Sequence, residues 1–199
     1  MILNRLSPDE ARRRAVDRYS DPEWLARQPH PESFSEDPWL ALRAAEVPLA
    51  EELQAMGFAI DSAWELYRYG NYDDAIPLLV RHMHHDYPDR VREGIAVALN
   101  RRASRPYWPE LRTLYVTARE HDAKSGLANF MSTLVTPKTL PEYIDLIRDA
   151  NNGVSRILLI RALKRLRDPR GRAFLETLVV DPVLGKEARA TVEGRSRSH

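Results

Sequence analysis

The chain has 199 residues, of which 43% are hydrophobic and 30% are charged, and this composition excludes wholesale disorder. The formal net charge is only +1, so a globally basic surface is excluded as the driver of nucleic-acid binding, although a local basic patch is not. The chain has no cysteine and no run of about 18 apolar residues, which excludes disulfides, thiolate chemistry, cysteine zinc sites and a membrane-spanning helix.

The first 46 residues are predicted to form an N-terminal helical extension that contains a proline-rich loop. A capping-box pattern, with Ser7 as N-cap, Pro8 in the first turn and Glu10 three residues after Ser7, predicts a helix over Pro8–Tyr19. The stretch QPHPESFSEDP predicts a loop, after which WLALRAAE is expected to return to helix and close one end of the fold. The start of the chain lacks the apolar region of an export signal, so we expect a cytoplasmic protein.

Three stretches recur at a spacing of 32 residues: IPLLVRHM from Ile76, WPELRTLY from Trp108 and LPEYIDLI from Leu140. Each has a proline as its second residue, and proline suits the first turn of a helix because its missing N–H has no partner there to lose. Three equivalent helices are therefore predicted to begin at these points.

A second helix is predicted to follow each of these, with the same spacing. The three sequences are VREGIAVAL from Val91, AKSGLANFM from Ala123 and SRILLIRAL from Ser155. A shorter unit follows from Gly171, and an earlier degenerate unit is predicted to begin a helix at Pro48 and to use Asp61 as the N-cap of a second. The predicted fold is all-α: a right-handed α-solenoid of about five helix pairs over residues 47–193, with a disordered tail at 194–199.

The second helices, of which the first reads DRVREGIAVAL from Asp89, resemble HEAT-like repeats of the phycobilisome-lyase type. The residues that carry this resemblance are Asp89, Val91, Arg92, Ile95, Ala98, Leu99, Lys124, Leu127, Met131, Arg156, Leu159 and Leu163. The resemblance covers roughly residues 47–192, and the order of segments is similar to small stand-alone bacterial HEAT-like proteins. It implies a helical scaffold, and it indicates a fold far more strongly than a function.

A basic residue occupies one slot in each second helix: Arg92, Lys124, Arg156 and Lys186. We interpret these as a structural ladder, in which each cation bonds a carboxylate of a nearby turn, because a partly buried cation needs a partner. The candidate carboxylates are Asp86, Asp89, Asp122, Asp149 and Asp181. The alternative is a row of phosphate-binding cations.

A basic run, Ser155 to Arg172, carries seven cations against the single acid Asp168. Arg161, Lys164 and Arg165 lie within one turn of each other on a helix, so they are predicted to bind a partner, either an acidic protein or a nucleic-acid backbone. A solvated face without a partner is the alternative.

The outward positions of the second helices give the remaining candidate partner-binding residues: Arg90, Glu93, Val97 and Asn129. Arg90 is distinctive because the later units do not repeat it; Asp122 and Val154 occupy its slot. An exposed Val97 or Ile157 would favour contact with a partner.

The histidines of HMHHD, His82 to Asp86, are interpreted as a polar helix end rather than a metal site, since no further ligand is signalled. Trp64, Tyr67 and Trp108 are predicted to pack between units. Packing is also favoured for Trp24 and Trp39, for which docking of a partner is the alternative. No phosphate loop, nucleophile elbow or H-E-x-x-H motif is present.

The sequence therefore favours a non-enzymatic protein-binding module without a cofactor, and an immunity or inhibitor protein is one hypothesis. The alternative is a nucleic-acid-binding HEAT-like protein related to alkylpurine DNA glycosylases. A self-associating scaffold is a third possibility.

Overall fold

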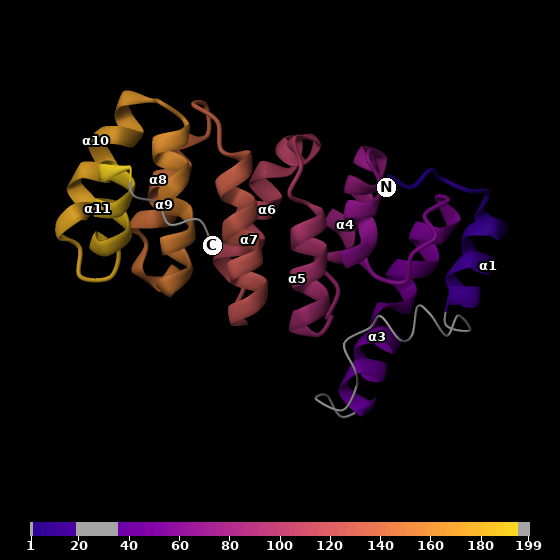
Figure 1. Cartoon of the computed structure of the whole chain (residues 1–199). Coiled ribbons are helices and arrows are strands. Elements are labelled where there is room, and N and C mark those ends of the chain that lie inside the picture. The colour runs from indigo at the N-terminus through magenta and orange to yellow at the C-terminus, as the bar shows by residue number, and fades with distance from the viewer. Residues whose placement is uncertain (1, 19–35, 195–199) are drawn as a thin grey trace. The chain divides into compact units, whose positions relative to one another are not determined.

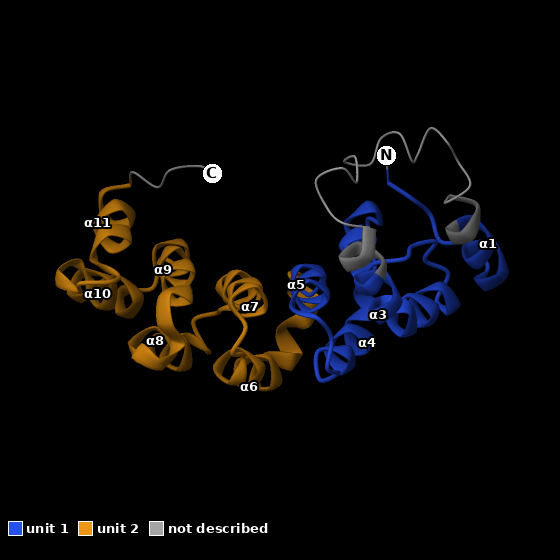
Figure 2. Ribbon diagram, turned by 90° about the horizontal axis from the view of Figure 1, so that it is seen from below, with its two compact units in different colours: residues 1–99 blue, residues 100–199 orange. Residues whose placement is uncertain are grey.

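The structure is a computed structural model that describes residues 2–18 and 36–194 (Figure 1). All regular elements in these residues are helical, and the one extended feature is an isolated bridge between Leu3 and Tyr69. The all-α prediction is thereby confirmed. Among the described helices, none is long and apolar enough to cross a membrane. The chain divides into two compact units, Met1–Leu99 and Asn100–His199, which Figure 2 distinguishes by colour.

The first unit contains four α-helices in its described residues. They are α1 (Pro8–Arg18), α3 (Glu36–Ala55), α4 (Ile76–His82) and α5 (Asp89–Ala98), with the 3₁₀ helices η2 (Ala63–Arg68) and η3 (Asp73–Ala75) before α4. The predicted capping box starts α1: the main-chain N–H of Ser7 donates to Glu10, and that of Glu10 donates to the Ser7 hydroxyl. The structure describes this helix as far as Arg18, and Tyr19, its predicted last residue, lies outside the described residues.

The prediction that a helix begins at Pro48 is wrong. Pro48 lies inside α3, which includes WLALRAAE as predicted but runs on past residue 46, so the boundary predicted there falls within one helix. An exposed proline is tolerated at this place because water can reach the carbonyl that loses its helical partner. The last three residues of QPHPESFSEDP also belong to α3, and the rest of that predicted loop, Trp24 and the tail at 195–199 lie outside the described residues, as does the side chain of Trp39.

The start of η2 also differs from the prediction. Its N-cap is Ser62 rather than Asp61, and the element is a 3₁₀ helix rather than an α-helix. The buried carboxylate of Glu46 accepts from the Ser62 hydroxyl at 2.9 Å and from the main-chain N–H of Ala63 at 2.6 Å. Glu46 in α3 thus fixes the point at which η2 begins.

The N-terminal strand-like segment lies against this unit through main-chain bonds. The N–H of Leu3 donates to the carbonyl of Arg68, and the N–H of Leu6 donates to that of Gly57. Arg5 pairs with Asp74 and stands 4.4 Å from the centroid of the Phe58 ring. Residues before α1 therefore belong to the packed unit.

The second unit consists of three successive pairs of α-helices. In the described residues they are α6 (Trp108–Thr117) with α7 (His121–Leu134), α8 (Leu140–Arg148) with α9 (Arg156–Arg165), and α10 (Pro169–Thr177) with α11 (Gly185–Glu193). The 3₁₀ helix η4 (Arg102–Tyr107) precedes α6, η5 (Ala150–Ser155) joins α8 to α9, and η6 (Leu178–Val180) lies between α10 and α11. The predicted prolines stand in the first turns of α4, α6 and α8, which confirms those three starts.

The pairs of the second unit form two layers. Helix α9 packs against α7 and α11 in its own layer and against α8 and α10 in the other, as Figure 2 shows. Buried tyrosines join the layers: Tyr143 donates to the carbonyl of Leu159 at 2.6 Å, and the hydroxyls of Tyr115 and Ser155 are 2.8 Å apart. Trp108 is buried beside Tyr143 as predicted. This order is typical of helical repeats, whereas the right-handed solenoid stays a prediction.

Candidate functional site

One residue of η2 and four residues of α5 form a cluster that we call the Trp64–Arg90 surface: Trp64 from η2, and Arg90, Glu93, Gly94 and Val97 from α5. Arg90, Glu93 and Val97 follow one another at helical spacing along one face of α5. The guanidinium of Arg90 donates to Glu93 at 2.5 Å and stands 4.3 Å from the centroid of the Trp64 ring. The Trp64 indole N–H donates to the Arg90 carbonyl at 3.2 Å. The structure thus brings together three predicted partner-binding residues and Trp64, which the sequence assigned to packing between units.

Gly94 explains why Trp64 lies so close to α5. A Cβ at this glycine would stand 2.4 Å from the indole Nε1 and 2.6 Å from Cδ1, which no side chain can tolerate without movement of the ring. The role of Gly94 was not recognised from the sequence. Gly126 occupies the same position in the next unit, so glycine there is compatible with a general feature of the repeat. The missing side chain at Gly94 thus leaves room for the Trp64 ring, and the Arg90 carbonyl and guanidinium hold the ring in place.

Exposed apolar groups accompany this surface. Val97 is 46% exposed, which meets the condition under which the sequence favoured partner contact, whereas Ile157 is only partly exposed. Tyr67, predicted to pack between units, is instead 80% exposed. Asn129, the fourth outward residue, is exposed on α7 in the second unit.

Three cations of the basic run already bond other groups of the protein. Arg161 pairs with Glu187 at 2.8 Å, Lys164 donates to the carbonyl of Thr191 at 2.8 Å, and Arg165 donates to the carbonyl of Ser132. These bonds tie α9 to α11 and to α7. The three predicted partner-binding residues therefore also hold neighbouring helices together.

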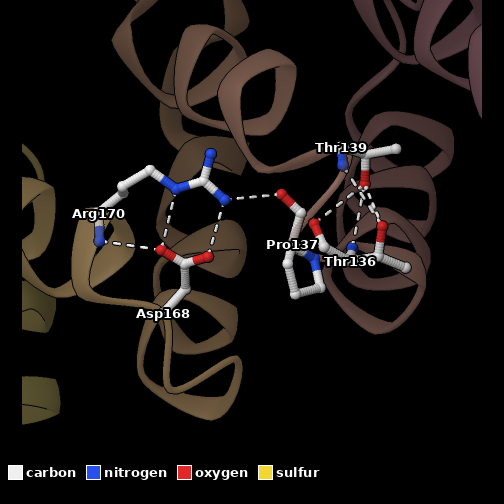
Figure 3. A network of polar contacts seen from close by, with 5 residues as sticks. All are labelled: Thr136, Pro137, Thr139, Asp168 and Arg170. Atoms are coloured by element: carbon white, nitrogen blue, oxygen red, sulfur yellow. Dashed lines mark hydrogen bonds and ion pairs between the residues drawn. The ribbon is translucent and has the colours of Figure 1, made fainter.

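Arg170 in the same run closes a network around the start of α10 (Figure 3). Asp168 is the N-cap of α10 and accepts from the main chain and the guanidinium of Arg170, which also donates to the Pro137 carbonyl at 2.8 Å. Thr136 and Thr139 close the adjoining turn with reciprocal bonds from N–H to hydroxyl. The network joins the turn between α7 and α8 to α10.

An open pocket of about 800 Å³ lies beside this run. Its lining includes the cations Lys164, Arg165, Arg167 and Arg172 and the acids Asp168 and Glu176. Since Arg172 bonds Glu176 at 3.1 Å and Asp168 bonds Arg170, the charge of the pocket is mixed.

The predicted ladder differs from the structure in what its cations bond. Lys124 donates to the Ala118 carbonyl at 3.2 Å, and the buried Arg156 donates to the carbonyls of Ile147 and Gly153 at 3.1 and 3.0 Å. Ala118 and Ile147 stand at the ends of α6 and α8, where carbonyls lack helical partners and a cation is favourable. For Lys124 and Arg156 the bonded partner is thus a carbonyl and not a carboxylate.

Two aspartates of the ladder, Asp149 and Asp181, accept main-chain hydrogen bonds within their own turns. Asp149 accepts from the N–H of Asn151 at 3.0 Å, and Asp181 accepts from those of Val183 and Leu184 at 2.8 and 2.7 Å, which lowers the pKa of Asp181. Asp122 bonds His121, and Lys186 is exposed. A short carboxylate satisfies main-chain donors in its own turn more readily than a distant cation. The pairing of Arg92 with Asp86 or Asp89 stays a prediction.

His82 stands at the end of α4, as predicted, but it is completely buried. Its Nδ1 is 2.7 Å from the Tyr87 hydroxyl and its Nε2 is 3.1 Å from Glu52, while His85 stacks on its ring at 4.7 Å. Burial lowers the pKa of His82, and the opposing effect of Glu52 is smaller. Among the described residues no three His, Asp or Glu side chains are placed to hold a metal ion.

The buried His82 predicts a pH-dependent stability. Because its folded pKa lies below the ordinary value of 6.5, the unfolded chain binds the extra proton, so the free energy of unfolding should fall as the pH drops through about 6.5. The slope cannot exceed about 1.4 kcal/mol per pH unit for one proton. Urea unfolding between about pH 7.5 and 5.5 measures it, and His82→Gln should remove the slope.

Glu46 provides the internal control for that measurement. Burial raises the pKa of Glu46, so the folded state holds its proton more tightly and this group should stabilise the protein as the pH falls toward 4.5. Glu46→Gln should therefore make the free energy of unfolding fall more steeply as the pH drops toward 4.5. If His82→Gln leaves the dependence of this free energy on pH unchanged, the role given to His82 is wrong.

Comparison of the chain with family models, with curated proteins and with solved structures finds no match in any of the three. The class that the fold defines is therefore an all-helical protein built of paired helices.

Proposed function

We propose that the protein is a non-enzymatic module that binds another protein through the Trp64–Arg90 surface, on a scaffold of HEAT-like repeats. The observation that carries the proposal is the fixed stack of Arg90 on Trp64 beside the exposed Val97. Tryptophan and arginine are the residues that most often dominate the energy of protein interfaces. Contacts that already hold them in the free protein reduce the ordering cost of association.

The surface suits a protein partner in its chemistry as well as its rigidity. Arg90 keeps 57% of its side chain exposed while its position is fixed by Glu93 and Trp64, so it can still donate to a partner's carboxylate or carbonyl. Val97 supplies apolar area one helical turn beyond Glu93. We further propose an immunity or inhibitor role for such a rigid surface, which a toxin or effector gene beside this gene in several genomes would support.

Nucleic-acid binding, with a relationship to alkylpurine DNA glycosylases, is the alternative. The pocket beside the basic run, with four cations in its lining, is the observation that favours it. Against it, Arg161, Lys164 and Arg165 already bond other groups of the protein, and acids share the pocket. Each phosphate contact would have to replace one of these bonds.

Affinity capture from lysate of the native cells, with and without nuclease, separates these alternatives. We expect a captured polypeptide that resists nuclease and that Arg90→Glu weakens by about tenfold or more, because the substitution removes the stack and places two carboxylates together. The matched control is Arg105→Glu, since Arg105 is exposed and lies on η4 in the second unit.

Loss of all capture after nuclease treatment would contradict the proposal. The alternative would then require that charge reversal of Arg161 and Arg165 lowers the affinity for duplex DNA in a gel-shift series and reduces its dependence on salt. We expect this double variant to leave the captured polypeptide unchanged.

A further inference from the structure

A second open pocket, of about 620 Å³, lies in the unit Asn100–His199 where the end of α6 meets η5. Its lining consists of Val116, Thr117, Ala118, Arg119, His121, Lys124, Asn151, Asn152, Gly153, Val154 and Ser155. Two permanent cations and a histidine are present, and no carboxylate belongs to this lining. The pocket is therefore chemically different from the mixed pocket beside the basic run.

The cations of this pocket are held in different ways. Lys124 is half-buried, donates to the Ala118 carbonyl and lies 5.3 Å from the centroid of the Tyr115 ring, so its ammonium group has a defined position. Burial lowers the pKa of Lys124, against a smaller opposing effect of Asp149. Arg119 is exposed, and it makes no hydrogen bond or ion pair with any described residue. His121 bonds Asp122. An anion between Lys124 and Arg119 would thus meet one fixed and one free cation.

Asn152 adds an acceptor that has no donor. The side chain is only 2% exposed, and its Nδ2 donates to the Leu146 carbonyl at 2.9 Å. This bond determines the orientation of the amide, because the Oδ1 atom would repel that carbonyl. In this orientation Oδ1 is buried without a hydrogen-bond partner, which is rare in folded proteins.

The chain around Asn152 leaves space over its main chain. Gly153 has φ 62° and ψ −148°, a conformation essentially restricted to glycine, and no atom lies within 4 Å of the place a Cβ would take. Val154 is 58% exposed and Val116 is 43% exposed in the same lining. The pocket therefore combines positive charge with exposed apolar area.

We propose that this pocket binds an acidic residue of a polypeptide, flanked by apolar side chains. Its carboxylate lies between Arg119 and Lys124, and its apolar neighbours cover Val116 and Val154. A simple anion covers neither valine, so the exposed apolar area beside the two cations favours an acidic peptide over a simple anion. The inference rests on the proposed function only in taking the partner to be a polypeptide, and it adds the partner's chemistry at a separate site.

The test is an NMR titration of the full ¹⁵N-labelled chain with N-acetyl-Leu-Glu-Leu-amide. We expect saturable shifts of the main-chain signals of Lys124, Gly153 and Val154, and binding weaker by about tenfold for the Leu-Gln-Leu peptide and for sodium acetate. Arg119→Glu should weaken the binding of the Glu peptide by about fivefold or more. Arg105→Glu, with the same change of charge outside the pocket, should leave it unchanged.

Three results would overturn the inference: equal binding of the Gln peptide, equal binding of acetate, or shifts that Arg119→Glu leaves intact. Lys124→Gln is a second variant, and its folding is checked by the dispersion of the same spectra. Arg90→Glu should not alter the titration. Peptide binding here without a polypeptide at the Trp64–Arg90 surface would contradict the proposed function alone, and the reverse result would contradict this inference alone.

Discussion

Replacement of Gly94 by alanine is expected to lower the free energy of unfolding by about 2 kcal/mol, although alanine is the better helix former by about 1 kcal/mol. The reason is the approach of Trp64, whose Nε1 would stand 2.4 Å from the new Cβ. The ring has to move away from α5, and that movement breaks its bond to the Arg90 carbonyl and its stack with the guanidinium.

A double-mutant cycle with Trp64→Ala isolates this effect. When the indole is absent, Gly94→Ala should be neutral or stabilising, because only helix propensity remains. Urea unfolding of the four proteins measures the coupling. An equal cost of Gly94→Ala in both backgrounds would contradict the role given to Trp64.

Arg156→Met is expected to cost about 3 kcal/mol of folding stability, because it leaves the buried carbonyl of Ile147 without its charged donor and removes the bond to the Gly153 carbonyl. Arg156 is only 7% exposed and bonds the carbonyls of Ile147 and Gly153. The same substitution at Lys186, the exposed residue in the equivalent slot, should change stability by less than about 0.5 kcal/mol. Thermal and urea unfolding of both variants measure the difference.

This pair of variants also tests the interpretation of the ladder. A row of ligand-binding cations would make both residues important for binding and neither important for stability. If Arg156→Met unfolds as the wild type does, the structural role of the ladder is wrong at its most buried member.

The fold could be predicted from the sequence wherever one local signal had one structural meaning. The prolines at the starts of α4, α6 and α8 and the capping box of α1 are such signals. Pro48 was misleading, because a proline is equally compatible with the first turn of a helix and with an exposed interior position. Asp61 and Ser62 are adjacent N-cap formers, and the contact of Ser62 with Glu46, sixteen residues away, selects between them.

The candidate sites were less predictable, because they depend on contacts between distant segments. Arg90 was identified as distinctive since the later units do not repeat it, but Trp64, 26 residues earlier, was assigned to packing. The pocket beside η5 carries no motif, since its cations come from α7 and the turn before it and its exposed Val154 comes from η5. The cations of the basic run were predicted as a group, whereas their partners lie on α7 and α11.

The most direct test of the proposed binding function is site-specific photo-crosslinking at Val97. A photoreactive phenylalanine analogue replaces Val97 in living cells, and Val180, which is 88% exposed in the second unit, serves as the control position. We predict a crosslinked adduct with a polypeptide at Val97 that nuclease does not remove, that Arg90→Glu weakens and that is absent at Val180. No polypeptide adduct at Val97, or the same adduct at both positions, would contradict binding through the Trp64–Arg90 surface.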